Sequence, residues 1–116
     1  MAIARLKADE APDAVFEFTV LSSWLGRLRG LLATGPDADP VALTRCSSIH
    51  TFGMAYPIDV AFIGERGEVL SVHRSVAPGR CLSEGQAACV LERPESGEGW
   101  VKPGQHLWIS AISAGF

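Results

Sequence analysis

Residues 47–62 read Ser-Ser-Ile-His-Thr-Phe-Gly-Met-Ala-Tyr-Pro-Ile-Asp-Val-Ala-Phe. This stretch joins a polar His-Thr pair, a Phe-Gly-Met corner and an apolar run without a break. The run at 57–63 predicts a strand that places Ile58, Val60 and Phe62 on one face and Asp59 on the other, between small and apolar neighbours. A carboxylate in such a place has to be paired or accept several hydrogen bonds. We therefore expect Asp59 to be buried and to brace the preceding corner, with a role as general base or ligand contact as the alternative.

The rest of the chain shows the same alternation of short apolar runs and turn residues. Strands are predicted at 3–7, 14–20, 43–49, 57–63, 68–76, 87–92 and 105–113. Gly and Pro residues separate them, as in many closed or nearly closed β domains. The predicted fold class is mainly β, at the margin of α+β. We expect one compact domain over 1–116, a barrel-like or sandwich-like fold of short antiparallel strands with one short amphipathic helix over about 23–33.

The predicted helix carries an apolar stripe at helical spacing. The stripe consists of Trp24, Leu25, Leu28, Leu31 and Leu32, and it predicts a face that packs on the β core. Two glycines, Gly26 and Gly30, lie on the opposite side. Each costs about 1 kcal/mol relative to alanine within a helix. Either something packs closely against the back of the helix, or weak helicity is tolerated there.

Composition narrows the possible partners. The 116 residues carry a formal net charge of −3, which argues against binding to nucleic acid or to an anionic membrane surface. No window contains the roughly 20 apolar residues of a membrane-spanning helix, and charged residues interrupt the first 18 positions, where a signal peptide needs an apolar run. Three cysteines without a C-x-x-C pair favour reduced thiols. These features predict a soluble, cytoplasmic protein.

Six residues are candidates for one polar cleft near the corner. They are His50, Thr51, Met54, Asp59, Arg80 and Glu92. Gly53 permits a sharp corner that could bring His50 and Met54 to one point, and a histidine with a thioether suits a soft ion such as Cu(I). One histidine and one methionine are a weak signal, so we expect no metal and no cofactor. Glu92 ends an apolar run and could pair with an arginine across the sheet.

Three segments together resemble a known family. The segments at 27–32, 49–62 and 90–92 resemble the small prokaryotic domain of unknown function, family 192, and the resemblance covers about residues 15–107. It implies a compact, mostly β domain with a short helix and no settled activity. Many relatives look exported, with a signal sequence or lipid anchor ahead of the domain.

Three functions compete on these observations. The first is a small, non-enzymatic binding or accessory domain whose cleft holds an unknown small ligand or protein partner. The second is a small hydrolase or transferase in which Asp59 and His50 form an acid–base pair, with Ser47, Ser48 or a cysteine as nucleophile. The third is a purely structural motif in a protein-interaction domain. In each case we expect a monomer or weak dimer. Convergence of the cleft residues in one open pocket would favour a ligand or chemistry.

Overall fold

Nine strands and one helix lie within residues 2–32 and 34–114, the part of the chain that the computed structural model describes. In chain order they are β1 (Ala2–Ala8), β2 (Ala11–Leu21), α1 (Trp24–Arg29), β3 (Val41–Thr44), β4 (Ser48–His50), β5 (Ile58–Gly64), β6 (Val69–Val76), β7 (Cys81–Ser83), β8 (Ala87–Pro94) and β9 (Leu107–Ala114). The prediction of a mainly β domain with one short helix is confirmed. No helix in this part of the chain is long and apolar enough to cross a membrane.

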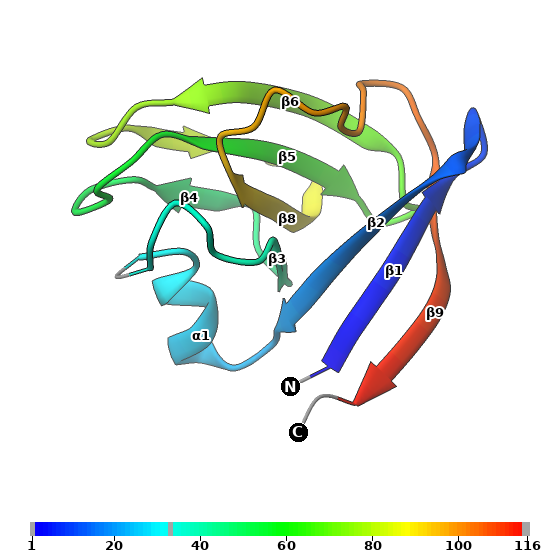
Figure 1. Cartoon of the computed structure of the whole chain (residues 1–116), viewed down its shortest axis with the longest axis horizontal. Coiled ribbons are helices and arrows are strands. Elements are labelled where there is room, and N and C mark those ends of the chain that lie inside the picture. The colour runs from blue at the N-terminus through cyan, green and yellow to red at the C-terminus, as the bar shows by residue number, and fades with distance from the viewer. Residues whose placement is uncertain (1, 33, 115–116) are drawn as a thin grey trace.

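Seven strands form one sheet in the order β6-β5-β8-β3-β2-β1-β9, and β4 pairs with β7 as a separate ribbon. All neighbouring strands are antiparallel except β2 and β3, which run parallel because α1 lies in the connection between them. The sheet bends so far that β1, β2 and β9 lie at an angle to β5, β6 and β8 (Figure 1). Its two edge strands approach each other through the isolated bridge between Glu68 and His106. The fold is therefore barrel-like but not a closed barrel.

The sheet carries an apolar core on each face. Every residue of β5 is buried, and its side chains alternate between the two cores as predicted. Ala61 and Ile63 join the core that contains Phe18 and Trp100. Ile58, Val60 and Phe62 belong to the second core, on the opposite face of the sheet. This core also contains Leu31, Met54 and Tyr56. Neighbouring residues of β5 and β8 therefore reach different environments.

The helix differs from the prediction in length and in orientation. α1 begins after Ser23, whose Oγ accepts the Gly26 N–H at 3.0 Å, and ends at Gly30, where φ is 51°. Trp24, Leu25 and Leu28 are 71%, 67% and 55% exposed. The predicted core-facing stripe is wrong for these three residues. The prediction assumed that the helix continues to Leu32. Because it ends at Gly30, Leu31 turns into the core as part of the following loop, and the helix remains on the surface.

Candidate functional site

Thr51 fixes the corner of the 47–62 stretch. Its side chain is fully buried, and its Oγ1 donates to the Ala77 carbonyl at 2.8 Å and accepts the Arg80 N–H at 2.8 Å. The Thr51 N–H donates to the Arg80 carbonyl at 2.8 Å, and its carbonyl accepts the Gly79 N–H at 3.0 Å. Thr51 thus joins the corner to the turn at Pro78 and Gly79. Arg80 takes part through its backbone, and its side chain is exposed.

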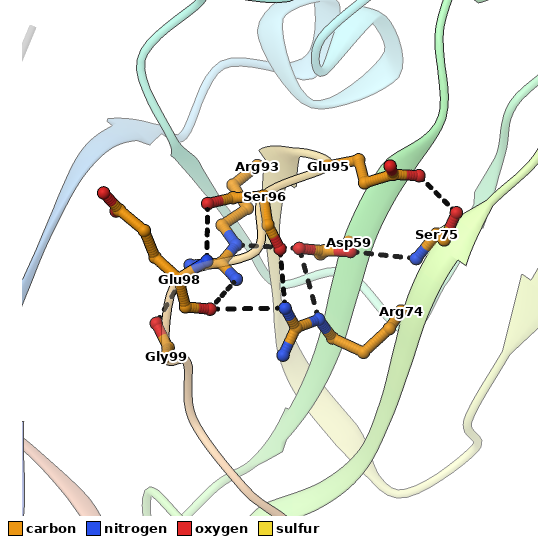
Figure 2. A network of polar contacts seen from close by, with 8 residues as sticks. All are labelled: Asp59, Arg74, Ser75, Arg93, Glu95, Ser96, Glu98 and Gly99. Carbon is orange, nitrogen blue, oxygen red and sulfur yellow. Dashed lines mark hydrogen bonds and ion pairs between the residues drawn. The ribbon is translucent and has the colours of Figure 1, made fainter.

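Asp59 is buried, as predicted, but its partners are not in the corner. Its carboxylate lies 2.9 Å from Arg93 Nε and 3.3 Å from Arg74 Nε, and it accepts the Ser75 N–H at 2.9 Å (Figure 2). The Arg93 side chain is only 8% exposed, whereas that of Arg74 is 45% exposed. The prediction that Asp59 braces the preceding corner is therefore wrong. Asp59 instead joins β5 to β6 and β8.

Arg74 and Arg93 also hold the loop at 95–99 in place. Arg93 donates from Nη1 to the Gly99 carbonyl at 3.1 Å and from Nη2 to the Glu98 carbonyl at 3.0 Å. Arg74 Nη2 donates to the Ser96 carbonyl at 2.7 Å (Figure 2). The Arg93 guanidinium also lies over the Trp100 ring, 4.8 Å from its centre. These contacts anchor the loop at 95–99. The Asp59 carboxylate is engaged by Arg93, Arg74 and the Ser75 N–H.

Glu92 precedes Arg93 on β8 but lies in a different environment. Because successive strand residues point to opposite faces, Glu92 lies on the side of the sheet that carries α1. It is 4% exposed, and no ion pair or side-chain hydrogen bond to it occurs within residues 2–32 and 34–114. Burial raises the pKa of Glu92 to about 7. A hydrogen bond from the backbone N–H of Leu31 to the carboxyl group lowers the pKa, but by less than burial raises it.

Gly30 makes room for this carboxyl group. A Cβ atom at Gly30 would lie 2.6 Å from Glu92 Oε1, far inside van der Waals contact, and the positive φ also disfavours a side chain. The sequence left open whether the helix glycines accommodate a close neighbour. At Gly30 that neighbour is Glu92.

The Glu92 carboxyl group lies at a cavity of about 70 Å³, which we call the Glu92 pocket. Its polar lining consists of Arg27, Arg29, Ser48, His50 and Glu92, with Gly30 between them. Its apolar lining consists of Leu28, Leu31, Leu43, Ile49, Met54 and Ile58. The exposed His50 ring stacks on Phe52, with centroids 5.5 Å apart. The pocket thus combines apolar and polar walls of similar extent with one buried carboxyl group.

The two arginines of the Glu92 pocket are engaged with backbone carbonyls. Arg27 Nη1 donates to the Arg45 carbonyl at 2.9 Å, and Arg29 Nε donates to the Leu32 carbonyl at 3.2 Å. Arg27 Nε is buried and has no hydrogen-bond partner among the described residues. Neither guanidinium forms an ion pair with Glu92.

Half of the predicted cleft therefore converges. His50, Met54 and Glu92 line the same pocket, whereas Thr51, Asp59 and Arg80 belong to the two bracing networks. Sequence reasoning missed Arg74 and Arg93 as the partners of Asp59. It also missed Arg27, Arg29 and Ser48 in the pocket lining, although Gly30 signalled close packing there. No cluster of three histidine, cysteine or acidic side chains suited to a metal ion occurs in the part of the chain that is described.

The comparisons with known proteins support the fold and the family. A family model for DUF192, described as Uncharacterized ACR, matches residues 5–107. No curated protein matches the chain significantly. A solved protein of unknown function from Novosphingobium aromaticivorans has a TM-score of 0.71 at 17% identity, covering 91% of this chain and 84% of its own. A Sinorhizobium meliloti structure titled "putative transcription regulator" has a TM-score of 0.72 at 20% identity, covering 94% and 93%. At such identities the two structures show a shared fold alone. The family match extends over most of the sequence, and the chain therefore belongs to the DUF192 family of uncharacterised proteins.

Proposed function

We propose that this chain is a small, non-enzymatic binding domain that uses the Glu92 pocket to hold a small polar group of a ligand or partner. The observation that carries the proposal is the buried Glu92 carboxyl group, which has no ion-pair partner among the described residues and lies in a cavity lined by His50 and Met54. A buried carboxylate without a counter-ion is costly even where one backbone N–H donates to it. A bound group that hydrogen-bonds to Glu92 offsets this cost.

Asp59 supplies the contrast within the same protein. Both carboxyl groups are buried, but Asp59 has two arginines and the Ser75 N–H as partners, whereas Glu92 has the Leu31 N–H and no ion pair among the described residues. A carboxylate that only supports the fold is expected to be satisfied in the way that Asp59 is. The lack of a counter-ion for Glu92 among the described residues supports a role outside the folding of the chain.

The surroundings of the pocket also suit a binding surface. Leu28 lines the pocket and is mostly exposed, and Trp24 and Leu25 are exposed on the same short helix. Phe52 is 54% exposed beside His50. Exposed aromatic and aliphatic side chains next to a pocket favour contact with a ligand or partner chain.

The acid–base alternative has less support. It needs Asp59 to orient or deprotonate His50. Instead, Asp59 pairs with Arg74 and Arg93, and the His50 ring stacks on Phe52. The structural alternative accounts for Thr51 and Asp59 but not for Glu92. A cytoplasmic location and a monomeric or weakly dimeric state stay predictions from the sequence.

A fragment titration followed by two-dimensional amide NMR tests the proposed function. A mixture of small amines, amides, carboxylates and alcohols is added to the full chain. We expect the signals of Gly30, Leu31 and His50 to shift, and those of Arg74 and Ser96 in the Asp59 network to stay in place. Shifts confined to the Asp59 network, or no specific shifts with any fragment, would contradict a binding role for the Glu92 pocket.

A further inference from the structure

We propose that the group held by the Glu92 pocket is a carboxylate, with its oxygens at the Arg27 guanidinium and the Glu92 carboxyl group and its aliphatic stem on the apolar wall. This inference rests on the proposed function and names the chemical class of its ligand. Three features of the pocket support it: the donors left without partners, the proton that Glu92 can offer, and the size and walls of the cavity.

Arg27 keeps one edge of its guanidinium without a partner. Its Nη1 donates to the Arg45 carbonyl at 2.9 Å, whereas Nε is buried and, like Nη2, donates to no described residue. The Nε and Nη2 groups of an arginine point in the same direction and match the two oxygens of a carboxylate. A buried donor without a partner is costly, and a carboxylate supplies the missing acceptors. Because Nε is buried, the side chain has to turn towards the cavity that it lines to use both donors.

The positive charge in the lining exceeds the negative charge. Arg27 and Arg29 form no ion pair among the described residues. Arg29 donates from Nε to the Leu32 carbonyl, which leaves its two Nη groups without a partner in the same part of the chain. Glu92 is the acidic residue of the lining. Even when Glu92 is ionised, two arginines face one carboxylate, so the lining can balance one added negative charge.

Glu92 becomes a donor to an anion when it carries a proton. The Leu31 N–H already donates to its carboxyl group, and burial nevertheless raises the pKa of Glu92 to about 7. A neutral carboxyl group has one O–H donor. This donor forms a short, strong hydrogen bond with a carboxylate oxygen. One oxygen of the ligand can therefore bind at Arg27 while the other accepts the Glu92 proton.

The charged and titratable groups that line the pocket are Arg27 and Arg29 from α1, His50 from β4 and Glu92 from β8, while β3 and β5 contribute apolar side chains. As the pH rises through about 7, Glu92 changes from a donor into an anion that repels the ligand. Carboxylate binding should therefore weaken. His50 acts in the same direction, because it loses its positive charge as the pH rises. An ammonium ligand would bind more tightly as Glu92 ionises.

The size and the walls of the cavity favour a carboxylate over a larger oxyanion. A volume of about 70 Å³ is several times the roughly 10–15 Å³ that one water molecule requires, so the cavity holds a group of a few non-hydrogen atoms. Its polar and apolar walls are similar in extent. A carboxylate has acceptors at one end and leaves its stem for Leu28 and Met54, whereas phosphate would also turn acceptors towards the apolar wall.

The carboxylate belongs either to a free acid or to the last residue of a peptide, and the experiment distinguishes these sources. The probes are butyrate, butylamine, butyramide, inorganic phosphate and a short peptide with either a free or an amidated C-terminus. Each is titrated into the full chain at pH 6 and at pH 8. Affinity is read from the amide signals of Gly30, Leu31 and His50.

Two variants test the two sides of the site. Arg27→Gln removes the positive charge and the unpaired edge of the guanidinium. Glu92→Gln keeps a hydrogen-bond donor but cannot ionise, so it imitates the protonated form of Glu92. Glu65→Gln and Arg66→Gln, in the exposed loop between β5 and β6, are the matched controls.

We expect butyrate or the peptide with a free C-terminus to bind, with the tighter of the two identifying the source. From the protonated fraction of a group with a pKa of about 7, affinity should be about tenfold higher at pH 6 than at pH 8. Glu92→Gln should bind about tenfold more tightly than the unaltered chain at pH 8. Arg27→Gln should weaken binding at pH 6 at least tenfold, and the two control variants should leave it unchanged. If Arg27→Gln does not fold, the gain in Glu92→Gln decides.

The outcomes that would overturn the inference differ in what they say about the proposed function. If butylamine, butyramide or phosphate shifts the same amide signals more strongly than butyrate and the free peptide do, the ligand class is wrong and the binding role stands. If none of the probes and none of the fragments in the wider mixture binds, both proposals fail. Butyrate binding of equal strength in Arg27→Gln, or no gain in Glu92→Gln at pH 8, would also contradict the inference, because the carboxylate would then bind elsewhere.

Discussion

The substitution Glu92→Gln should change how the stability of the protein depends on pH. Glutamine keeps the size of the side chain but cannot ionise. The pKa of Glu92 is about 7 in the fold and 4.5 in the unfolded reference. Between these values the folded chain keeps a proton that the unfolded chain has lost, so the free energy of unfolding falls as the pH rises. The contribution of this proton is complete below pH 4.5 and is lost by about pH 7.

The size of the effect follows from the same two values. They are about 2.5 pH units apart, and each unit corresponds to about 1.4 kcal/mol, so ionised Glu92 should destabilise the fold by about 3 kcal/mol. The stability of Glu92→Gln relative to the unaltered chain should therefore rise by about that amount between pH 4.5 and pH 7.5. Urea unfolding, followed by tryptophan fluorescence at several pH values, measures the difference. Glu65→Gln should show no such trend. A difference that stays constant with pH would refute the reasoning.

Three further substitutions test the bracing networks and the helix. Asp59→Asn should destabilise the fold by about 3 to 5 kcal/mol in urea unfolding, because it leaves the buried Arg93 without its counter-ion; a loss below about 1 kcal/mol would contradict the network. Thr51→Val should cost about 1 to 3 kcal/mol, because the backbone groups bonded to Oγ1 lose their partner, and an unchanged midpoint would argue against the corner's anchoring. Leu28→Ala should change the free energy of unfolding by no more than about 0.5 kcal/mol, as at other surface positions; a loss of about 2 to 5 kcal/mol would show that Leu28 is buried.

The sequence predicted the parts of the fold that depend on local pattern. The alternation of residues 58–63 gave both faces of β5 correctly, and the burial of Asp59 followed from its apolar neighbours. Gly30 was identified as a place where something could pack closely on the helix, and that neighbour is Glu92. Each of these inferences needed only the side-chain period of a strand or the missing Cβ of a glycine.

The remaining features depend on contacts between distant segments. The partners of Asp59 come from β6 and β8, and no local pattern specifies which strands become neighbours. Glu92 was expected to pair with an arginine across the sheet, but the buried pair belongs to Arg93, one residue later and on the opposite face. The helix stripe was misjudged because the positive φ of Gly30 ends the helix before Leu31. An offset of one residue decided the case of Glu92, and the end of the helix at Arg29 instead of Leu32 decided the case of the stripe.

The most direct test of the account is the titration of the Glu92 carboxyl group itself. Carbon-13 NMR of the full chain with labelled glutamate, assigned through the loss of one signal in Glu92→Gln, reports its pKa without reference to stability or to any ligand. The account predicts a pKa of about 7 in the free protein, because the group is buried in its pocket without a counter-ion. A value near 4.5 would show that the carboxylate is solvated or paired, and it would contradict the pocket as a site that lacks its partner.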